Sequence, residues 1–217
     1  MRSDSEIKRD VEEELKWNPS VDPTDIGVAV KNRVVTLTGF VKSYSEKYEA
    51  ERAAKRVAGV VGVANDIEVR LPTGAERPDP ELARDAVAAI KSWLPASYEH
   101  IKVVVKNGWV TLEGAVEWNY QREYAERAVR PLKGVKGVTN LIELKPRATP
   151  SEIKQKIEEA FRRSAEIDAN RVTVETFGSE VVLKGTVRSW AERQEAERAA
   201  YAAPGVTKVD NRIVISP

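Results

Sequence analysis

Hydrophobic residues along the chain recur first with a helical spacing and then with an alternating spacing, and this order occurs three times. The first segment of each occurrence has apolar side chains at positions i, i+4 and i+8, which form one stripe on an α-helix. The stripes are Ile7, Val11 and Leu15; Leu82, Ala86 and Ile90; and Ile153, Ile157 and Phe161. The spacing predicts that each unit starts with an amphipathic helix that buries one face.

Apolar and polar residues alternate after each predicted helix, in two short runs joined by a turn. A period of two is typical of a β-strand with one buried face. The apolar positions are Ile26, Val28, Val30, Val35 and Leu37; Ile101, Val103, Val105, Val110 and Leu112; and Val172, Val174, Val181 and Leu183. The dipeptide Asn107-Gly108 separates the two runs of the middle unit and is a strong hairpin signal. We therefore expect an antiparallel hairpin in each unit.

A second helix and a last strand complete each unit. Small side chains on one face of this helix let it lie close to a sheet, and they are Ala50 and Ala53; Ala125 and Ala128; and Ala196 and Ala199. A right-handed crossover through the helix sets the last strand parallel to the second one. The predicted fold class is α+β: three tandem αββαβ modules, each a three-stranded mixed sheet with two helices on one face.

Glycines and asparagines at fixed offsets of 75 and then 71 residues align the three units without a gap. The glycines after the second strand are Gly39, Gly114 and Gly185, those after the second helix are Gly59, Gly134 and Gly205, and the asparagines are Asn65, Asn140 and Asn211. We expect the second set of glycines at helix C′ positions, where a left-handed backbone favours glycine. The asparagines are expected in a turn or bulge. The expected domains are residues 1–71, 79–146 and 149–217, joined by proline-containing linkers.

Capping signals predict where the helices begin. The first helices are expected to start at Ser3 with Glu6, at Asp79 before Pro80, and at Thr149 with Pro150 and Glu152. Two of the second helices open with Ser43 and Glu46 and with Ser189 and Glu192. In the middle unit Trp118 replaces the capping serine, and Asn119 is the alternative cap.

Composition excludes several kinds of chemistry. The 217 residues include 35 Lys and Arg against 34 Asp and Glu, one His and no Cys. The near-zero net charge argues against a dedicated nucleic-acid binder, and the absence of cysteine excludes disulfides and thiolate metal sites. No apolar run is long enough for a membrane span or a secretory signal. We expect a cytoplasmic protein, or a periplasmic one if a signal has been removed.

No residue pattern indicates catalysis, a cofactor or a metal site. His100 aligns with Asp25 and Arg171, so the only histidine is not a feature of the repeat. Glu-Arg pairs recur in the second helices, at residues 51–52, 126–127 and 197–198, and we interpret them as a solvated, salt-bridged face. The sequence therefore predicts a protein that is not an enzyme.

The complete pattern resembles the BON domain, a bacterial module. The resemblance rests on Gly-x-Val after the second strand, on Ala-Glu-Arg-Ala in the second helix, and on the ending Gly-Val-x-x-Val-x-Asn-x-Ile, each present three times. It covers about 195 residues and implies a non-enzymatic protein of the osmotically inducible type. The family is associated with phospholipid surfaces, with osmotic or envelope stress and, in one cytoplasmic branch, with potassium binding.

Aromatic residues and positive charge concentrate in the middle unit. Residues 81–145 hold three of the five tryptophans and three of the six tyrosines, with 10 basic and 8 acidic residues. Amphipathic rings and cations suit the interface of an anionic membrane. The candidate residues for binding a lipid or a partner are Trp118, Tyr120, Arg122, Trp109 and Trp93. Trp118 is equally suited to pack between two units, and Trp109 could pack against a neighbouring unit.

Three functions stay open at this point. The leading hypothesis is binding to anionic phospholipid surfaces or membrane-associated proteins in a stress context. The alternatives are a soluble potassium-responsive protein and an adaptor or chaperone-like protein that binds polypeptides. Because a unit of 65 residues is marginally stable alone, we also expect the units to pack together and to cover part of their open sheet faces.

Overall fold

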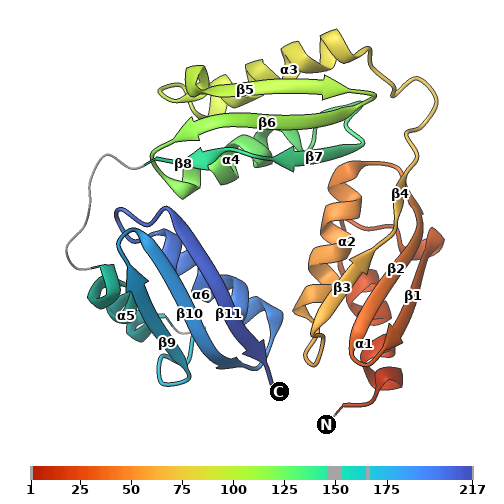
Figure 1. Cartoon of the computed structure of the whole chain (residues 1–217). Helices are drawn as coiled ribbons and strands as arrows, with labels where there is room; N and C mark the ends of the chain where they lie inside the picture. Colours follow the sequence, from red (N-terminus) through yellow and green to blue (C-terminus); the bar gives the residue numbers. More distant parts are fainter. Residues whose placement is uncertain (1, 146–152, 165–166, 217) are drawn as a thin grey trace.

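The computed structural model describes residues 2–145, 153–164 and 167–216, and they form three modules of one design (Figure 1). Module 1 contains α1 (Asp4–Trp17), β1 (Ile26–Lys31), β2 (Val34–Val41), α2 (Tyr44–Arg56), β3 (Gly62–Asn65) and β4 (Glu68–Val69). Module 2 contains α3 (Asp79–Trp93), β5 (Ile101–Lys106), β6 (Trp109–Val116), α4 (Asn119–Val129), β7 (Gly137–Asn140) and β8 (Glu143–Leu144). Module 3 contains α5 (Ile153–Arg163), β9 (Val172–Phe177), β10 (Glu180–Val187), α6 (Trp190–Tyr201) and β11 (Lys208–Ile215).

Each module has a mixed sheet with the second strand at its centre. The hairpins β1–β2, β5–β6 and β9–β10 are antiparallel, and the last strand lies parallel to β2, β6 or β10. In modules 1 and 2 this last strand is divided into two segments, β3 and β4 or β7 and β8, whereas β11 is continuous. The predicted α+β fold class, with its αββαβ order, is confirmed.

The core of each module lies between its sheet and its two helices. All nine residues of the predicted helix stripes are buried, and they join the buried faces of the strands and the alanines of the second helix in three separate clusters. The alanines keep the second helix close to the sheet because a larger side chain would separate the two layers. One separate apolar cluster for each repeat therefore stabilises each fold.

Gly39, Gly114 and Gly185 lie where two strands approach too closely for a side chain. Their φ angles are +105°, +120° and +128°. A Cβ atom on Gly185 would lie 2.0 Å from the backbone oxygen of Arg171, and the distances at the other two positions are nearly the same. The repeated glycine is therefore needed for its backbone conformation and for its lack of a side chain.

Gly59, Gly134 and Gly205 also have positive φ, but their predicted position at helix C′ is wrong. The helices end at Arg56, Val129 and Tyr201, and each glycine lies three to five residues later. Each occupies the third position of a β-turn, closed by hydrogen bonds of 3.2 to 3.3 Å from the N–H groups of Val60, Val135 and Val206. Glycine is favoured there because the third position of a type II turn has positive φ.

Asn65, Asn140 and Asn211 connect the last strand to the second helix. The amide nitrogen of Asn65 donates to the backbone oxygen of Lys47 at 3.3 Å and to the carboxylate of Glu51 at 3.0 Å, and its oxygen accepts from the N–H of Ile67. The same bonds recur in modules 2 and 3, with Glu126 and Glu197 as the acidic partners. Each asparagine therefore holds the turn, as expected, and also connects the last strand to the second helix. The sequence analysis did not predict this second contact.

The capping predictions have mixed outcomes. Ser3 and Glu6 form the predicted capping box. Ser43 and Ser189 accept hydrogen bonds from the N–H groups of Glu46 and Glu192. Asp79 is the first residue of α3 rather than its cap, and its carboxylate accepts from the two N–H groups of the Asn107-Gly108 turn. The predicted start at residues 149–152 lies outside the described residues.

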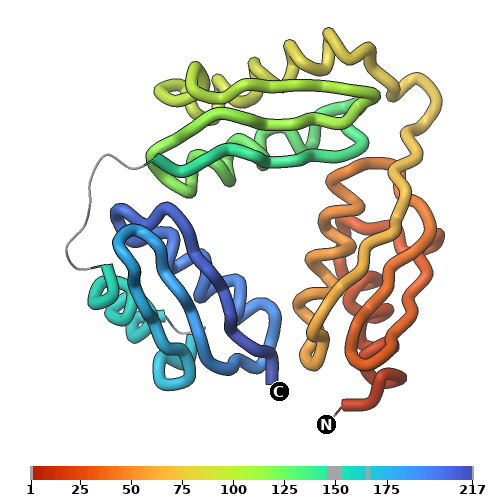
Figure 2. The backbone as a smooth tube through the Cα atoms, in the orientation of Figure 1, coloured from red at the N-terminus to blue at the C-terminus, as the bar shows by residue number. Residues whose placement is uncertain are grey.

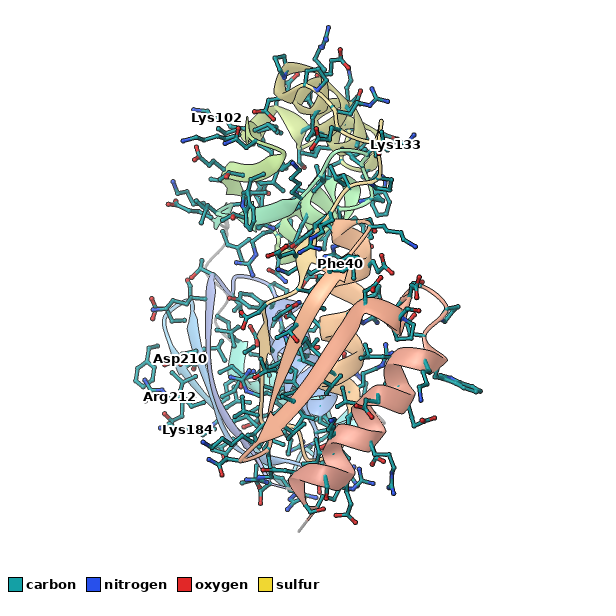
Figure 3. The ribbon with its side chains drawn as sticks, turned by 90° about the vertical axis from the view of Figure 1, so that its right-hand side faces the viewer. Phe40, Lys102, Lys133, Lys184, Asp210 and Arg212 are labelled. Carbon is teal, nitrogen blue, oxygen red and sulfur yellow. The ribbon has the colours of Figure 1, made fainter. Side chains whose placement is uncertain are left out.

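The modules surround a common centre, with α2, α4 and α6 on the inner side and α1, α3 and α5 on the outer side (Figure 1). Residues 71–78 carry the chain from module 1 to module 2 (Figure 2). The units do pack together, as expected, but their open sheet faces are not the contact surfaces. In module 3 that face carries Lys184, Asp210 and Arg212, whose side chains point outward (Figure 3). Charged side chains there keep the open face in water, so the second helices make the contacts instead.

We expect Gly185→Ala to destabilise module 3 far more than Gly178→Ala. Both glycines have positive φ, but a Cβ on Gly178 meets no atom within 4 Å, so the control isolates the clash with Arg171. The free energy of unfolding should fall by more than about 3 kcal/mol for Gly185→Ala and by about 1 kcal/mol for Gly178→Ala. Urea denaturation followed by circular dichroism measures both, and equal losses would contradict the close-approach explanation.

The bond between Glu51 and Asn65 should make stability depend on pH. Burial alone would raise the pKa of the Glu51 carboxyl, but hydrogen bonds from Lys55 and Asn65 outweigh it and lower that pKa below its ordinary value of 4.5. A carboxyl whose pKa is lower in the folded state stabilises the fold above its unfolded pKa, and this contribution is lost as the pH falls through the folded pKa.

Glu51→Gln should therefore lower the free energy of unfolding at pH 7 by about 1 kcal/mol and flatten its fall between about pH 5 and 3. Glu68→Gln removes an exposed carboxylate of the same module and should change stability little. Denaturation at a series of pH values tests this, and parallel pH profiles for Glu51→Gln and the wild type would contradict it.

Candidate functional site

An exposed aromatic cluster lies on module 2, between the end of α3 and the start of α4. The ring of Tyr124 makes edge-to-face contacts with Trp93, at 5.9 Å between centroids, and with Tyr120, at 5.6 Å. Trp93 and Tyr120 remain about half exposed. The cluster unites two of the five candidate residues and adds Tyr124, which sequence reasoning did not single out. The sequence contains a signal for this contact, because Tyr120 and Tyr124 are four residues apart on a predicted helix and such side chains are neighbours.

Trp118 takes the N-cap position of α4, and it is 41% exposed. An indole ring has no oxygen to accept from the helix, so the cap is built differently here. The side-chain oxygen of Gln121 accepts from the N–H groups of Glu117 and Trp118, at 3.0 and 2.9 Å. Asn119 does not replace the cap, because its amide nitrogen donates to Glu123 and its buried oxygen has no hydrogen-bond partner among the described residues.

Trp109 lies apart from the other candidates. It starts β6, whereas Trp118 follows the end of that strand, so roughly 25 Å separate them along the strand direction. The indole nitrogen donates to Thr139 on β7 at 2.8 Å, and the ring covers Gly137 on the same strand. Trp109 therefore covers a gap left by glycine in its own sheet.

Arg122 points away from the aromatic cluster. Its guanidinium group lies over the ring of Tyr201 in module 3, 5.0 Å from the centroid. Tyr120 and Arg122 are two residues apart on α4, which turns their side chains by about 200° relative to one another. The predicted anchor of Trp118, Tyr120 and Arg122 is therefore divided between an outer surface and a module border.

A cation lies over an aromatic ring at each of the three module borders. The pairs are Arg130, which directly follows α4, on Tyr48 of α2; Arg122 of α4 on Tyr201 of α6; and Lys55 of α2 on Trp190 of α6, at 3.3, 5.0 and 5.2 Å from the ring centroids. In each pair, a residue near the start of one inner helix contacts a residue at or just after the end of another inner helix. The contacts therefore run head to tail and close a ring of three modules.

The border between modules 1 and 2 has further contacts besides this stacking pair. Tyr44, at the start of α2, packs against the core of module 2, and burial followed by the nearby Glu126 raises the pKa of its phenol. The hydroxyl of Ser45 donates to the backbone oxygen of Arg130 at 3.3 Å. Arg130 thus connects to module 1 through both its side chain and its backbone.

A cavity of about 660 Å³ lies at the centre of the ring, where α2, α4 and α6 face one another. Its described lining is almost entirely polar and includes six arginines: Arg52, Arg56, Arg122, Arg127, Arg130 and Arg198. Four glutamates share the lining: Glu49, Glu123, Glu195 and Glu197. The arrangement can hold a charged ligand, but no side chain in it is a nucleophile of the serine or cysteine type.

The described residues contain no group of three or more His, Asp or Glu side chains arranged to hold a metal ion. Within the same residues, no helix combines the length and apolar character needed to cross a bilayer. The surface features that stand out are therefore the aromatic cluster and the arginine-rich cavity.

The fold and its repeats define a class: tandem α+β modules of the αββαβ type that assemble through their second helices. The family model for the BON domain matches residues 3–70, 81–146 and 150–217, which is nearly the whole chain. The chain therefore belongs to the BON domain family, with three tandem domains, and the resemblance found in the sequence is confirmed.

One curated relative shares clear sequence similarity. The chain is 34% identical over 148 residues to osmotically-inducible protein Y of Escherichia coli strain K12, which covers 65% of this chain and 73% of the relative. Two solved structures of CdsD, a structural protein of the type III secretion system of Chlamydia trachomatis, align at 16% and 15% identity with TM-scores of 0.28 and 0.27. The alignments cover 98% and 100% of this chain and 93% and 100% of the CdsD chains.

We expect the ring to open when the contacts of module 3 are removed. Trp190→Ala and Arg122→Gln together eliminate the stacking of module 3 against modules 1 and 2, and each such pair contributes about 0.5–1 kcal/mol. The radius of gyration from small-angle X-ray scattering should increase in the double variant while circular dichroism stays unchanged. Trp17→Ala, which removes an exposed tryptophan of module 1, is the control, and an unchanged radius in the double variant would contradict the contacts.

Proposed function

We propose that this chain is a non-enzymatic stress protein that binds anionic phospholipid surfaces, chiefly through the aromatic cluster of module 2. The single observation that carries the proposal is the set of contacts among Trp93, Tyr120 and Tyr124, which holds three amphipathic rings together at the surface. Rings of this kind favour the headgroup region of a membrane, because one end is apolar and the other forms hydrogen bonds.

Positive charge close to the cluster supports the same function. Arg127 lies 5.9 Å from the centroid of the Tyr124 ring, and Lys91, on the last turn of α3, lies 5.1 Å from that of Tyr98. A lysine or arginine near an anionic membrane surface adds about 1 kcal/mol to binding. Aromatic anchors and nearby cations together favour an anionic bilayer over a neutral one.

The relative supports a role in the response to osmotic stress. Osmotically-inducible protein Y is named for its induction by osmotic change, and 34% identity across 148 residues supports a related role for this chain. Binding to an envelope surface fits such a role, because osmotic change acts first on the envelope. An envelope-associated protein is the alternative binding partner, and the same aromatic cluster would serve it.

Vesicle binding tests the proposal. The protein should co-sediment with phosphatidylglycerol-containing vesicles and far less with pure phosphatidylcholine vesicles, and binding should weaken as salt screens the charges. The double variant Trp93→Ala and Tyr120→Ala should lose most of the bound fraction, because it removes the anchoring rings.

Trp17→Ala is the matched control for this experiment. Trp17 is 83% exposed at the end of α1, so its loss removes a surface tryptophan without touching module 2. Binding should be retained in this variant. If no vesicle composition binds the wild-type protein, or if both variants lose binding equally, phospholipid binding by the cluster is wrong.

A further inference from the structure

Three arginines at the same position of the repeat converge on the central cavity. Arg52, Arg127 and Arg198 each follow the glutamate of the Ala-Glu-Arg-Ala segment, on α2, α4 and α6. The interpretation as a solvated helix face is right about their exposure, but each module turns this face toward the same cavity. We propose that the cavity is a binding site for a compact anion that carries several phosphate groups, at a place distinct from the aromatic cluster.

The positive charge around the cavity is only partly balanced, because Arg56 pairs with Glu14 and Arg130 with Glu126, both at 2.9 Å and both outside the lining glutamates. The lining has six arginines against four glutamates, and two of those glutamates pair with a neighbouring arginine: Glu49 with Arg52 at 3.6 Å, and Glu195 with Arg198. Glu197 also binds Asn211, which holds it on the strand side. The lining glutamates are thus largely engaged, and four of the six lining arginines have a carboxylate partner.

Two of the arginines have no acidic partner among the described residues. Arg122 and Arg127 form no ion pair there, and each instead faces the ring of a tyrosine. A third lining residue, Arg130, pairs with Glu126 through Nη2 at 2.9 Å, but its buried Nε atom has no hydrogen-bond partner in that part of the chain. Guanidinium groups left with free donors, and gathered from all three modules, favour an anionic ligand.

Arginine matches phosphate in geometry as well as in charge. Its planar group donates two parallel hydrogen bonds to a pair of phosphate oxygens, so several arginines around one cavity suit a ligand with several phosphates. A volume of about 660 Å³ is that of a small-molecule site. The described lining has no aliphatic side chain larger than alanine, which disfavours an acyl chain and leaves the phosphate groups as the feature recognised.

Such a ligand would connect all three modules at once. Because the cavity is assembled from α2, α4 and α6, a bound anion stabilises the closed ring over any open arrangement. The ligand should therefore raise the melting temperature. In a protein whose modules are otherwise held by weak stacking contacts, it should also reduce the radius of gyration.

Titration calorimetry and thermal melting with sodium tripolyphosphate test the site, with sodium chloride at equal ionic strength as the reference. The wild-type protein should bind and melt at a higher temperature. The triple variant Arg52→Gln, Arg127→Gln and Arg198→Gln should bind at least about tenfold more weakly, because each arginine removed takes away charged hydrogen bonds. Arg127→Gln alone provides a second measurement if the triple variant unfolds.

The control variant Arg9→Gln, Arg84→Gln and Arg162→Gln removes the same charge from helices α1, α3 and α5, outside the cavity. It should keep wild-type affinity, as should Trp93→Ala. Absence of tripolyphosphate binding, or equal weakening in both triple variants, would overturn the proposal.

Competition with cardiolipin vesicles distinguishes the source of the phosphates. Vesicles that displace tripolyphosphate from the wild type, but do not bind the cavity variant, would assign the site to a lipid headgroup. Vesicles that fail to displace it would assign the site to a free phosphate compound. Both results support the cavity as the phosphate site, and vesicle binding that depends on Trp93 but not on the arginines leaves the two sites independent.

Discussion

The close packing of the second helix on its sheet is the constraint on which the rest of the structure depends. The buried alanines Ala50, Ala53, Ala125, Ala128 and Ala196 let the helix lie close to the sheet, and their small side chains contribute little apolar surface to the core. Its remaining faces carry long charged and aromatic side chains that reach outward. These side chains contact the neighbouring modules and line the cavity, so the inner helices determine both the ring and its centre.

Ring closure follows from the order of these contacts more than from their strength. Each stacking pair is weak, but the linkers keep the modules near one another and give each border a high effective concentration. The contacts are head to tail, and such contacts either close into a ring or continue into a filament. Lys55 of module 1 stacks on Trp190 of module 3. This third border joins the first module to the last one, so the contacts close into a ring.

The sequence predicts the modules well because their signals are local. The helix stripes, the hairpins and the parallel last strand depend on residues within about 65 positions, and each was recovered. The turn glycines were assigned to the wrong position because a positive φ fits both a helix C′ residue and a type II turn. Tyr120 and Arg122 were grouped by nearness in the sequence, although helical geometry alone separates them.

The arrangement of modules lies beyond such local signals. Whether Arg52, Arg127 and Arg198 face water or one another depends on the angle at which whole modules meet, and no spacing within a repeat encodes that angle. The repeat pattern shows that the arginines recur, but only the arrangement of the modules shows that they line one cavity.

One departure from the repeat connects the two candidate sites. At the position three residues before the cavity arginine, modules 1 and 3 have Glu49 and Glu195, which pair with Arg52 and Arg198. Module 2 has Tyr124 there, which supplies the central ring of the aromatic cluster and leaves Arg127 without a carboxylate partner among the described residues. This difference creates the outward aromatic surface and at the same time adds unpaired charge to the cavity. Together with Trp93 and Tyr120, which stand where module 1 has Asn18 and Ser45, this position distinguishes the surface of the middle module from that of its neighbours.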